Sequence, residues 1–264
     1  MKRKERENKS DKIVGSMNAL STMQITTDME GLDVESKVVL HSKEVLAVIL
    51  QGIIEEYKGY SLEEIMNFIE TDSIAESLEV STGRTNTQIR SDTPEFVQLN
   101  EKTSHFDVMF RAVNPMLSNN DVRVNLHIDV ESQKTYRPGY PIEKRGLYYL
   151  ARSLSAQLSL VTGTTDYNCL EKCYSIWICR DAIPKEEQYS ISFYEMVNTK
   201  NIGYSESHAK CLPEENDSRK NYDLQALVII RLGNKVYNGK KGDEGFELLR
   251  FLNAIMYPHQ DNFM

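Results

Sequence analysis

The sequence lacks any long hydrophobic run, although it has 264 residues. No stretch reaches the 18 or more apolar residues that would indicate a transmembrane helix. The first ten residues, MKRKERENKS, are charged, and no apolar segment follows them as it would in a secretory signal. The sequence therefore predicts neither a membrane anchor nor an exported protein.

Cysteines are few, and their spacing does not suggest a structural metal site. Cys169, Cys173, Cys179 and Cys211 form no C-x-x-C pair, and no histidine lies at zinc-finger spacing from them. We interpret them as reduced thiols of a cytoplasmic protein.

An excess of basic residues is also absent. The chain has 31 basic and 39 acidic side chains, a net charge of −8 and a pI of about 5.3. This balance argues against a general nucleic-acid coat or a protein that binds anionic membranes, because both need a basic surface. It does not exclude an enzyme that meets nucleic acid through a local basic rim.

The chain shows no internal repeats, and its hydrophobic pattern predicts one domain after a polar leader. Residues 1–36 are polar and mixed in charge, so we expect a flexible leader, followed by a single domain over 37–264. Helices are predicted at 38–57, 61–69, 141–160 and 244–256, and strands at 105–113, 122–132, 173–180, 189–197 and 223–232. This order predicts an α/β domain with a mixed sheet flanked by helices. In the third helix, we expect a core stripe of Leu147, Leu150, Leu154 and Leu158.

The segment NLHIDVESQK, which begins at Asn125, alternates strictly between apolar and polar residues. Such alternation is typical of a strand with one buried face. The apolar side carries Val124, Leu126, Ile128 and Val130. The polar side carries Asn125, His127, Asp129, Glu131 and Gln133.

A hairpin between the first two predicted strands would pair two carboxylates. With the turn centred near residue 119, Asp107 lies opposite Glu131. Opposed like charges destabilise a sheet, which suggests that one group is protonated or that a cation lies between them. Mg²⁺ fits, because it binds through one or two carboxylates and leaves other positions to water and phosphate. A solvated strand face would give the same alternation, and the pattern leaves that alternative open.

Asp107, followed after a gap by Glu131-Ser132-Gln133, resembles the D…(D/E)-x-K core of the PD-(D/E)XK nucleases, in an E-x-Q form. The segments FDVMF and NLHIDVESQKTYRPGYPIEKRGLYYLARSLSAQL resemble the PD-(D/E)XK family transposases more specifically. KEVLAVILQGIIEEYKGYSLEEI and YSIWIC are similar to flanking elements of that family. The resemblance covers about residues 40–255.

The resemblance implies a restriction-endonuclease-like core and metal-dependent cleavage of DNA phosphodiester bonds, linked to transposition or recombination. It implies Asp107 and Glu131 as ligands of Mg²⁺ or Mn²⁺, together with the backbone carbonyl of Ser132. Glu56 matches an acidic residue that completes the site through metal-bound water. The expected partners are DNA and a second copy of the chain in a homodimer, with no membrane.

Gln133 takes the place of the usual lysine, so the cation expected at that position is missing. The resemblance implies that Arg145 and Tyr149, on the helix after the motif, reach the phosphate. Lys134 is adjacent, but it would serve only if the strand bulged or ended there.

Three of these residues have simpler interpretations that the sequence leaves open. Arg145 could simply cap the polar face of its helix, Glu56 could lie on a solvated face, and His127 could be an ordinary hydrogen-bonding residue. For the whole chain, the alternative is a catalytically inactive relative that binds DNA or a protein.

Overall fold

The computed structural model describes residues 39–76, 79–80, 104–105, 107–119, 123–158, 166–199, 222–233, 239, 242–243 and 245–257. The predicted leader, residues 81–103 and Cys211 lie outside the described residues. Among the described residues, no helix combines the length and the apolar character needed to cross a membrane.

Two compact units make up the chain, one of residues 1–66 and 233–264 and the other of residues 67–232. The prediction of a single domain over 37–264 therefore stays a prediction.

The first unit contains helices from both ends of the part of the chain that the structure describes. They are α3 (Lys43–Ile53), the 3₁₀ turn η1 (Glu55–Tyr57), the start of α4 (Leu62–Phe68) and α8 (Phe246–Met256). The predicted helix over 38–57 is thus shorter than expected. Ser42 caps its start by accepting from the Val45 amide, and Ile54 adopts an extended backbone that separates α3 from η1.

The predicted capping box before α4 is present. The Ser61 amide donates to a Glu64 carboxylate oxygen at 2.7 Å, and the Glu64 amide donates to Ser61 Oγ at 3.3 Å. These reciprocal bonds satisfy amides at the helix start that have no partner within the helix.

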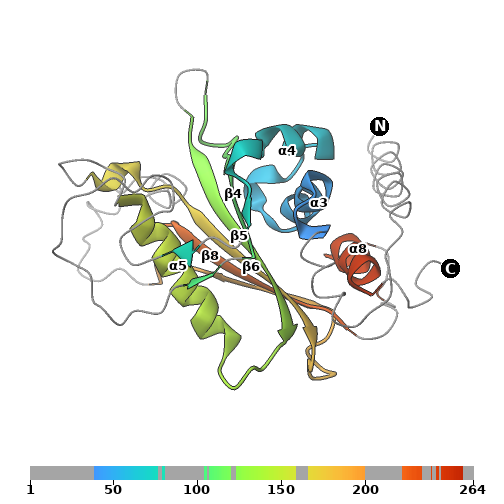
Figure 1. Cartoon of the computed structure of the whole chain (residues 1–264). Coiled ribbons are helices and arrows are strands. Elements are labelled where there is room, and N and C mark those ends of the chain that lie inside the picture. Colours follow the sequence, from blue (N-terminus) through green and yellow to red (C-terminus); the bar gives the residue numbers. More distant parts are fainter. Residues whose placement is uncertain are drawn as a thin grey trace, which may run out of the picture. The chain divides into compact units, whose positions relative to one another are not determined.

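The second unit is built on a mixed sheet of six described strands in the order β1-β4-β5-β6-β8-β7 (Figure 1). The strands are β1 (Ala75–Glu76), β4 (Val108–Val113), β5 (Asn125–Thr135), β6 (Cys173–Asp181), β7 (Ser190–Glu195) and β8 (Gln225–Arg231). A separate pair consists of β2 (Glu79–Val80) and β3 (Ser104–His105), and η2 (Thr71–Ser73) and η3 (Tyr167–Cys169) are 3₁₀ turns. β5, β6 and β8 are parallel, so their carboxyl ends meet at one edge of the sheet. The predicted α/β class with a mixed sheet is confirmed.

One helix, α5 (Ile142–Leu158), follows β5 and packs on β6 and β8 (Figure 1). The predicted leucine stripe is confirmed at Leu150, which is fully buried, and at Leu154, which is partly buried and packs against the core, but it is wrong at Leu147, which is 51% exposed. The buried residues of α5 are Ile142, Gly146, Tyr149, Leu150, Arg152, Ser153 and Ala156. Leucines occur on more than one side of this helix, so leucine spacing alone does not identify the whole buried side.

Gly146 lets α5 approach the sheet closely. A Cβ atom at this position would lie 2.4 Å from Leu227 Cδ1 and 3.2 Å from Trp177 Nε1. Leu227 and Trp177 are fully buried, so the room for a side chain here is small.

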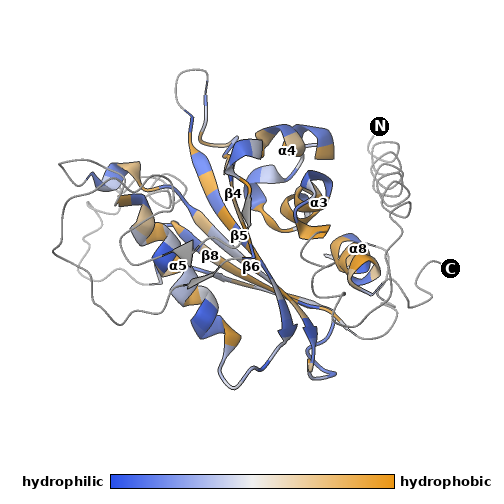
Figure 2. Cartoon of the chain, in the orientation of Figure 1, coloured by the Kyte–Doolittle hydropathy of each residue, from blue (hydrophilic) through white to orange (hydrophobic). Residues whose placement is uncertain are grey.

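The two faces of β5 differ in polarity, as the alternation of its sequence predicted. Leu126, Ile128 and Val130 are completely buried on one face. The strand becomes hydrophilic at its carboxyl end, which Figure 2 shows as a change of colour toward the arrowhead. Polar residues therefore gather on the α5 side and at the carboxyl edge of the sheet.

We expect Gly146→Val to lower the free energy of unfolding by about 1–3 kcal/mol, because the added methyl groups overpack the contact with Leu227 and Trp177. Ala151→Val is the matched control, since Ala151 is exposed on the same helix. Urea unfolding of both variants measures the difference. Equal stability of the two variants would contradict the close packing of α5.

Candidate active site

The hairpin of β4 and β5 has the predicted register. Val108 lies opposite Val130 and Phe110 opposite Ile128. One step further along, the Asp107 amide donates to Glu131 Oε1 at 3.0 Å. In return, the Ser132 amide donates to Asp107 Oδ2 at 3.0 Å. The structure therefore brings the Asp107 and Glu131 carboxylates together, and these two backbone bonds link them.

The parallel pairing of β5 and β6 continues the polar row across the sheet. Asp129 lies beside Ser175, Glu131 beside Trp177, and Gln133 beside Cys179. Residues paired in register point to the same face, so this row lies under α5.

Asp129 is a second buried acid on this face, and a short hydrogen-bonded chain holds it. Ser175 Oγ donates to Asp129 Oδ2 at 2.6 Å, and Trp177 Nε1 donates to Ser175 Oγ at 2.9 Å. The sequence pointed to Asp129 only as a neighbour of Glu131, and it did not indicate Ser175 or Trp177. The one available signal was a serine inside an otherwise apolar strand.

The two buried acids bind protons more tightly than usual. Burial, together with the negative charges of Asp129 and Asp107, raises the pKa of Glu131 to about 9. The Asp107 amide and the Arg145 guanidinium act in the opposite direction. Burial raises the pKa of Asp129 to about 8, against the bond from Ser175. A cation near these groups would favour their charged forms.

Arg145 extends from α5 to this row of residues. Its guanidinium donates to the Tyr149 hydroxyl at 2.8 Å and to Gln133 Oε1 at 3.4 Å. It also lies 5.0 Å from the centre of the Trp177 ring and 5.1 Å from that of Tyr149. Two aromatic rings therefore hold the Arg145 side chain against the acidic row. Its guanidinium does not simply extend into solvent from the helix surface.

Gln133 and Lys134 differ in orientation. Gln133 accepts from Arg145 and donates through Nε2 to the Thr135 carbonyl at 2.7 Å. β5 keeps its pairing with β6 through Thr135, so the bulge that would turn Lys134 toward the site is absent. By strand alternation Lys134 lies on the opposite face from Gln133, and it is exposed.

Three further residues named in the sequence analysis are Ser132, Glu56 and His127. Ser132 is buried and follows Glu131 directly, while Glu56 is buried in η1 of the first unit, so its part in the site stays a prediction. His127 bonds to Glu171 at 2.8 Å, in keeping with an ordinary hydrogen-bonding histidine.

Mg²⁺ suits the donors in this row. The described residues contain no group of three or more His, Cys, Asp or Glu side chains arranged to hold a metal ion. Mg²⁺ needs no such group, because it is bound by one or two carboxylates and completes its shell with water and substrate phosphate. Two carboxylates, those of Asp107 and Glu131, lie in this row, and burial disfavours the charged form of Glu131 and raises its pKa.

Comparison with known protein families finds a match for part of the chain. The model of the PD-(D/E)XK nuclease family transposases matches residues 85–206. This range contains Asp107, Glu131, Gln133, Arg145 and Tyr149. The match confirms the predicted resemblance and the restriction-endonuclease-like fold class. No curated protein and no solved structure matches the chain.

The raised pKa of Glu131 makes the stability of the metal-free protein depend on pH. The folded state keeps a proton on Glu131 that the unfolded state releases above its ordinary pKa of 4.5. Stability therefore falls as pH rises from about 5 to 9, by up to about 1.4 kcal/mol per pH unit for this group. Glu131→Gln should fall less steeply, because the amide never ionises.

Urea unfolding in EDTA at several pH values between 5.5 and 8 measures the two slopes. Glu186→Gln, at an exposed acid, should keep the slope of the parent chain. Parallel slopes for the parent chain and Glu131→Gln would contradict the elevated pKa.

Proposed function

Because residues 85–206 match the model of the PD-(D/E)XK nuclease family transposases, we propose that the protein is a metal-dependent endonuclease that hydrolyses DNA phosphodiester bonds in transposition or recombination. The observation that carries the proposal is the pair of Asp107 and Glu131 carboxylates, joined through backbone bonds beside the Arg145 guanidinium. A cation site next to a phosphate-binding side chain is what such a reaction needs.

Asp107 and Glu131 would hold Mg²⁺ or Mn²⁺ together with the Ser132 carbonyl and, through water, Glu56. When bound, the ion supplies Lewis-acid activation of water and phosphate. Arg145 would bind the phosphate, because a guanidinium presents a planar fork of N–H donors that matches phosphate oxygens. Tyr149 would keep that fork in place through its bond of 2.8 Å to Arg145.

Gln133 has a different role from the lysine usual at this position. An amide can neither take up a proton from water nor carry a positive charge. Its contact with Arg145 supports a division of the lysine's work, in which Arg145 supplies the charge and Gln133 orients it. Lys134 retains a role in substrate binding only if DNA also contacts the opposite face of β5.

The proposal also includes the cellular compartment and the oligomeric state. We place it in the cytoplasm of a bacterial cell, where reduced thiols such as the free cysteines Cys173 and Cys179 persist. A homodimer would bring two such sites to the two strands of a DNA duplex.

A catalytically inactive relative that binds DNA or a protein is the second candidate function. The observation that favours it is Gln133 at the lysine position, together with the net charge of −8. The two candidates differ in whether phosphodiester bonds are broken, so a cleavage assay separates them.

We expect the full chain to nick supercoiled DNA with Mg²⁺ or Mn²⁺, and EDTA to stop the reaction. Asp107→Asn and Glu131→Gln should each lower the rate more than about 100-fold, because removal of a direct ligand costs more than the 10–100-fold typical of outer residues. Glu186→Gln should cut at the parent rate, since Glu186 is exposed and outside this row. Nicking that survives both site variants would refute the assignment of the carboxylates.

Arg145→Gln should lower the turnover rate by about 100-fold, the cost of removing one donor that stabilises developing charge. Arg145→Lys should retain more activity than Arg145→Gln, since the charge remains although the fork is lost. The Mg²⁺ concentration for half-maximal rate should change little in either variant. A large change in that concentration with an unchanged maximal rate would instead assign Arg145 to the metal site.

A further inference from the structure

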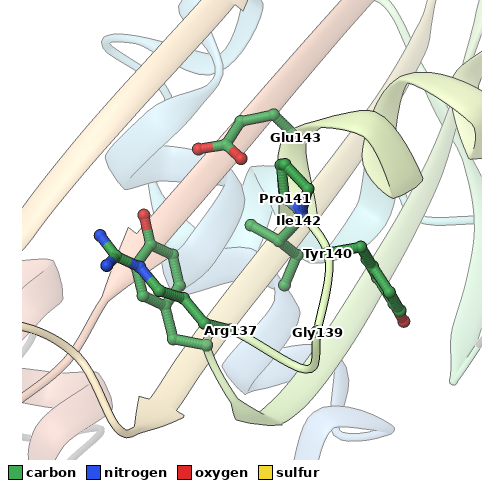
Figure 3. Close-up of a pocket in the computed structure, with 7 residues that line it drawn as sticks. Arg137, Gly139, Tyr140, Pro141, Ile142 and Glu143 are labelled. Carbon is green, nitrogen blue, oxygen red and sulfur yellow. The ribbon is translucent and has the colours of Figure 1, made fainter.

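A cavity lies at the carboxyl edge of the parallel strands, after the end of β5. It has a volume of about 460 Å³ and is lined by the loop between β5 and α5 and by the first turn of α5 (Figure 3). Small-ligand sites commonly have volumes of about 300–1,000 Å³. In sheets with parallel strands, ligands bind outside the carboxyl ends of those strands. Size and position therefore suit a ligand.

The inner wall of the cavity is fixed in place. Tyr136 is 5% exposed, and its hydroxyl donates to Glu187 at 2.8 Å and accepts from Arg231 Nε at 2.8 Å. Arg231, from β8, also donates to Ser192 Oγ at 2.8 Å. These bonds join the loop to β8 and β7, so the cavity does not depend on ligand for its shape.

Opposite charges are balanced around the cavity. Arg137 forms an ion pair with Glu187 at 2.7 Å, and Glu143 lies 3.9 Å from the Arg231 guanidinium. A phosphate would need a local excess of positive charge, which this arrangement does not provide. An uncharged ligand with both hydrogen-bond donors and acceptors suits it better.

The lining also matches the chemistry of a nucleobase. Pro141 provides an exposed apolar side chain beside the buried Ile142, and Arg137 and Glu143 provide a donor and an acceptor. Arginine reads the acceptor atoms of bases, and glutamate accepts from their amino groups. The Arg137 side chain is 65% exposed, so a base could reach it.

Tyr140 connects the lining of the cavity to Arg145. Its hydroxyl accepts from Arg145 at 3.2 Å, and Arg145 in turn contacts Gln133. Figure 3 shows the Tyr140 ring turned to the other side of the loop from the Glu143 carboxylate. The loop therefore has one side toward Arg145 and the other toward the cavity.

We propose that this cavity binds an unpaired nucleobase of the DNA strand whose phosphate lies at Arg145. The inference rests on the proposed function, because it takes DNA as the substrate, and it adds a base-binding position to the phosphate-binding one. A single strand or a locally opened duplex supplies such a base without an intact partner strand.

The test compares two short single strands of equal length, one with bases and one with an abasic backbone throughout. Both carry the same phosphates, so their electrostatic attraction at a given salt concentration is alike. Fluorescence anisotropy in EDTA, where no cleavage is expected, measures the affinity of the full chain for each strand. The parent chain should prefer the strand with bases by about tenfold, in the range of one base contact.

Arg137→Ala and Glu143→Gln should remove most of this preference and leave the affinity for the abasic strand within about twofold. Lys144→Ala is the matched control, because Lys144 is an exposed cation next to the cavity and does not line it. It should weaken both strands alike. Equal binding of the two strands by the parent chain, no binding of either strand, or an unchanged preference in both cavity variants would overturn the inference.

The outcome of this binding experiment does not depend on the outcome of the nicking assay. A base preference that depends on Arg137 and Glu143, without cleavage under any metal condition, would support the cavity and refute the nuclease. Cleavage without such a preference would support the nuclease and refute the cavity.

Discussion

Two backbone hydrogen bonds at the start of the β4–β5 hairpin determine much of the candidate site. The Asp107 amide binds the Glu131 carboxylate, and the Ser132 amide binds the Asp107 carboxylate. Each carboxylate therefore accepts a hydrogen bond from a backbone amide across the hairpin, which helps to orient it. The arrangement holds two negative groups together, and the protein must compensate for the resulting repulsion with protons, with Arg145 or with a cation.

Because the two carboxylates repel each other, the side chains around them are held in place by several contacts. Asp129 adds a third acid to the same face, and its bond from Ser175 is completed by the Trp177 indole. Trp177 also carries the Arg145 guanidinium on its ring, so one side chain supports an acid and a cation together. Gly146 permits this geometry, because any larger residue would push α5 away from Trp177 and Leu227.

Local patterns predicted part of this structure, and long-range pairing produced the rest. The β4–β5 register followed from strict alternation and the turn position, both of which lie within one short segment. The bond from Ser175 to Asp129 joins residues 46 apart, and that from Arg231 to Tyr136 joins residues 95 apart. No turn sets the register of such parallel strands, so neither contact could be predicted. On α5, Leu150 was correctly predicted as a core residue, whereas the predicted Leu147 is exposed and its neighbours Gly146 and Tyr149 are buried.

These contacts give a physical reason for glutamine in place of lysine at position 133. A lysine at position 133 would bring a second positive charge to within hydrogen-bond distance of the Arg145 guanidinium, and like charges at that separation repel. Glutamine removes the repulsion and offers an acceptor instead. Arg145 can then contact Gln133 and the Tyr140 hydroxyl through the same nitrogen, which joins the acidic row to the loop that lines the cavity. The neutral side chain at position 133 is thus compatible with a site in which Arg145, on the following helix α5, supplies the positive charge.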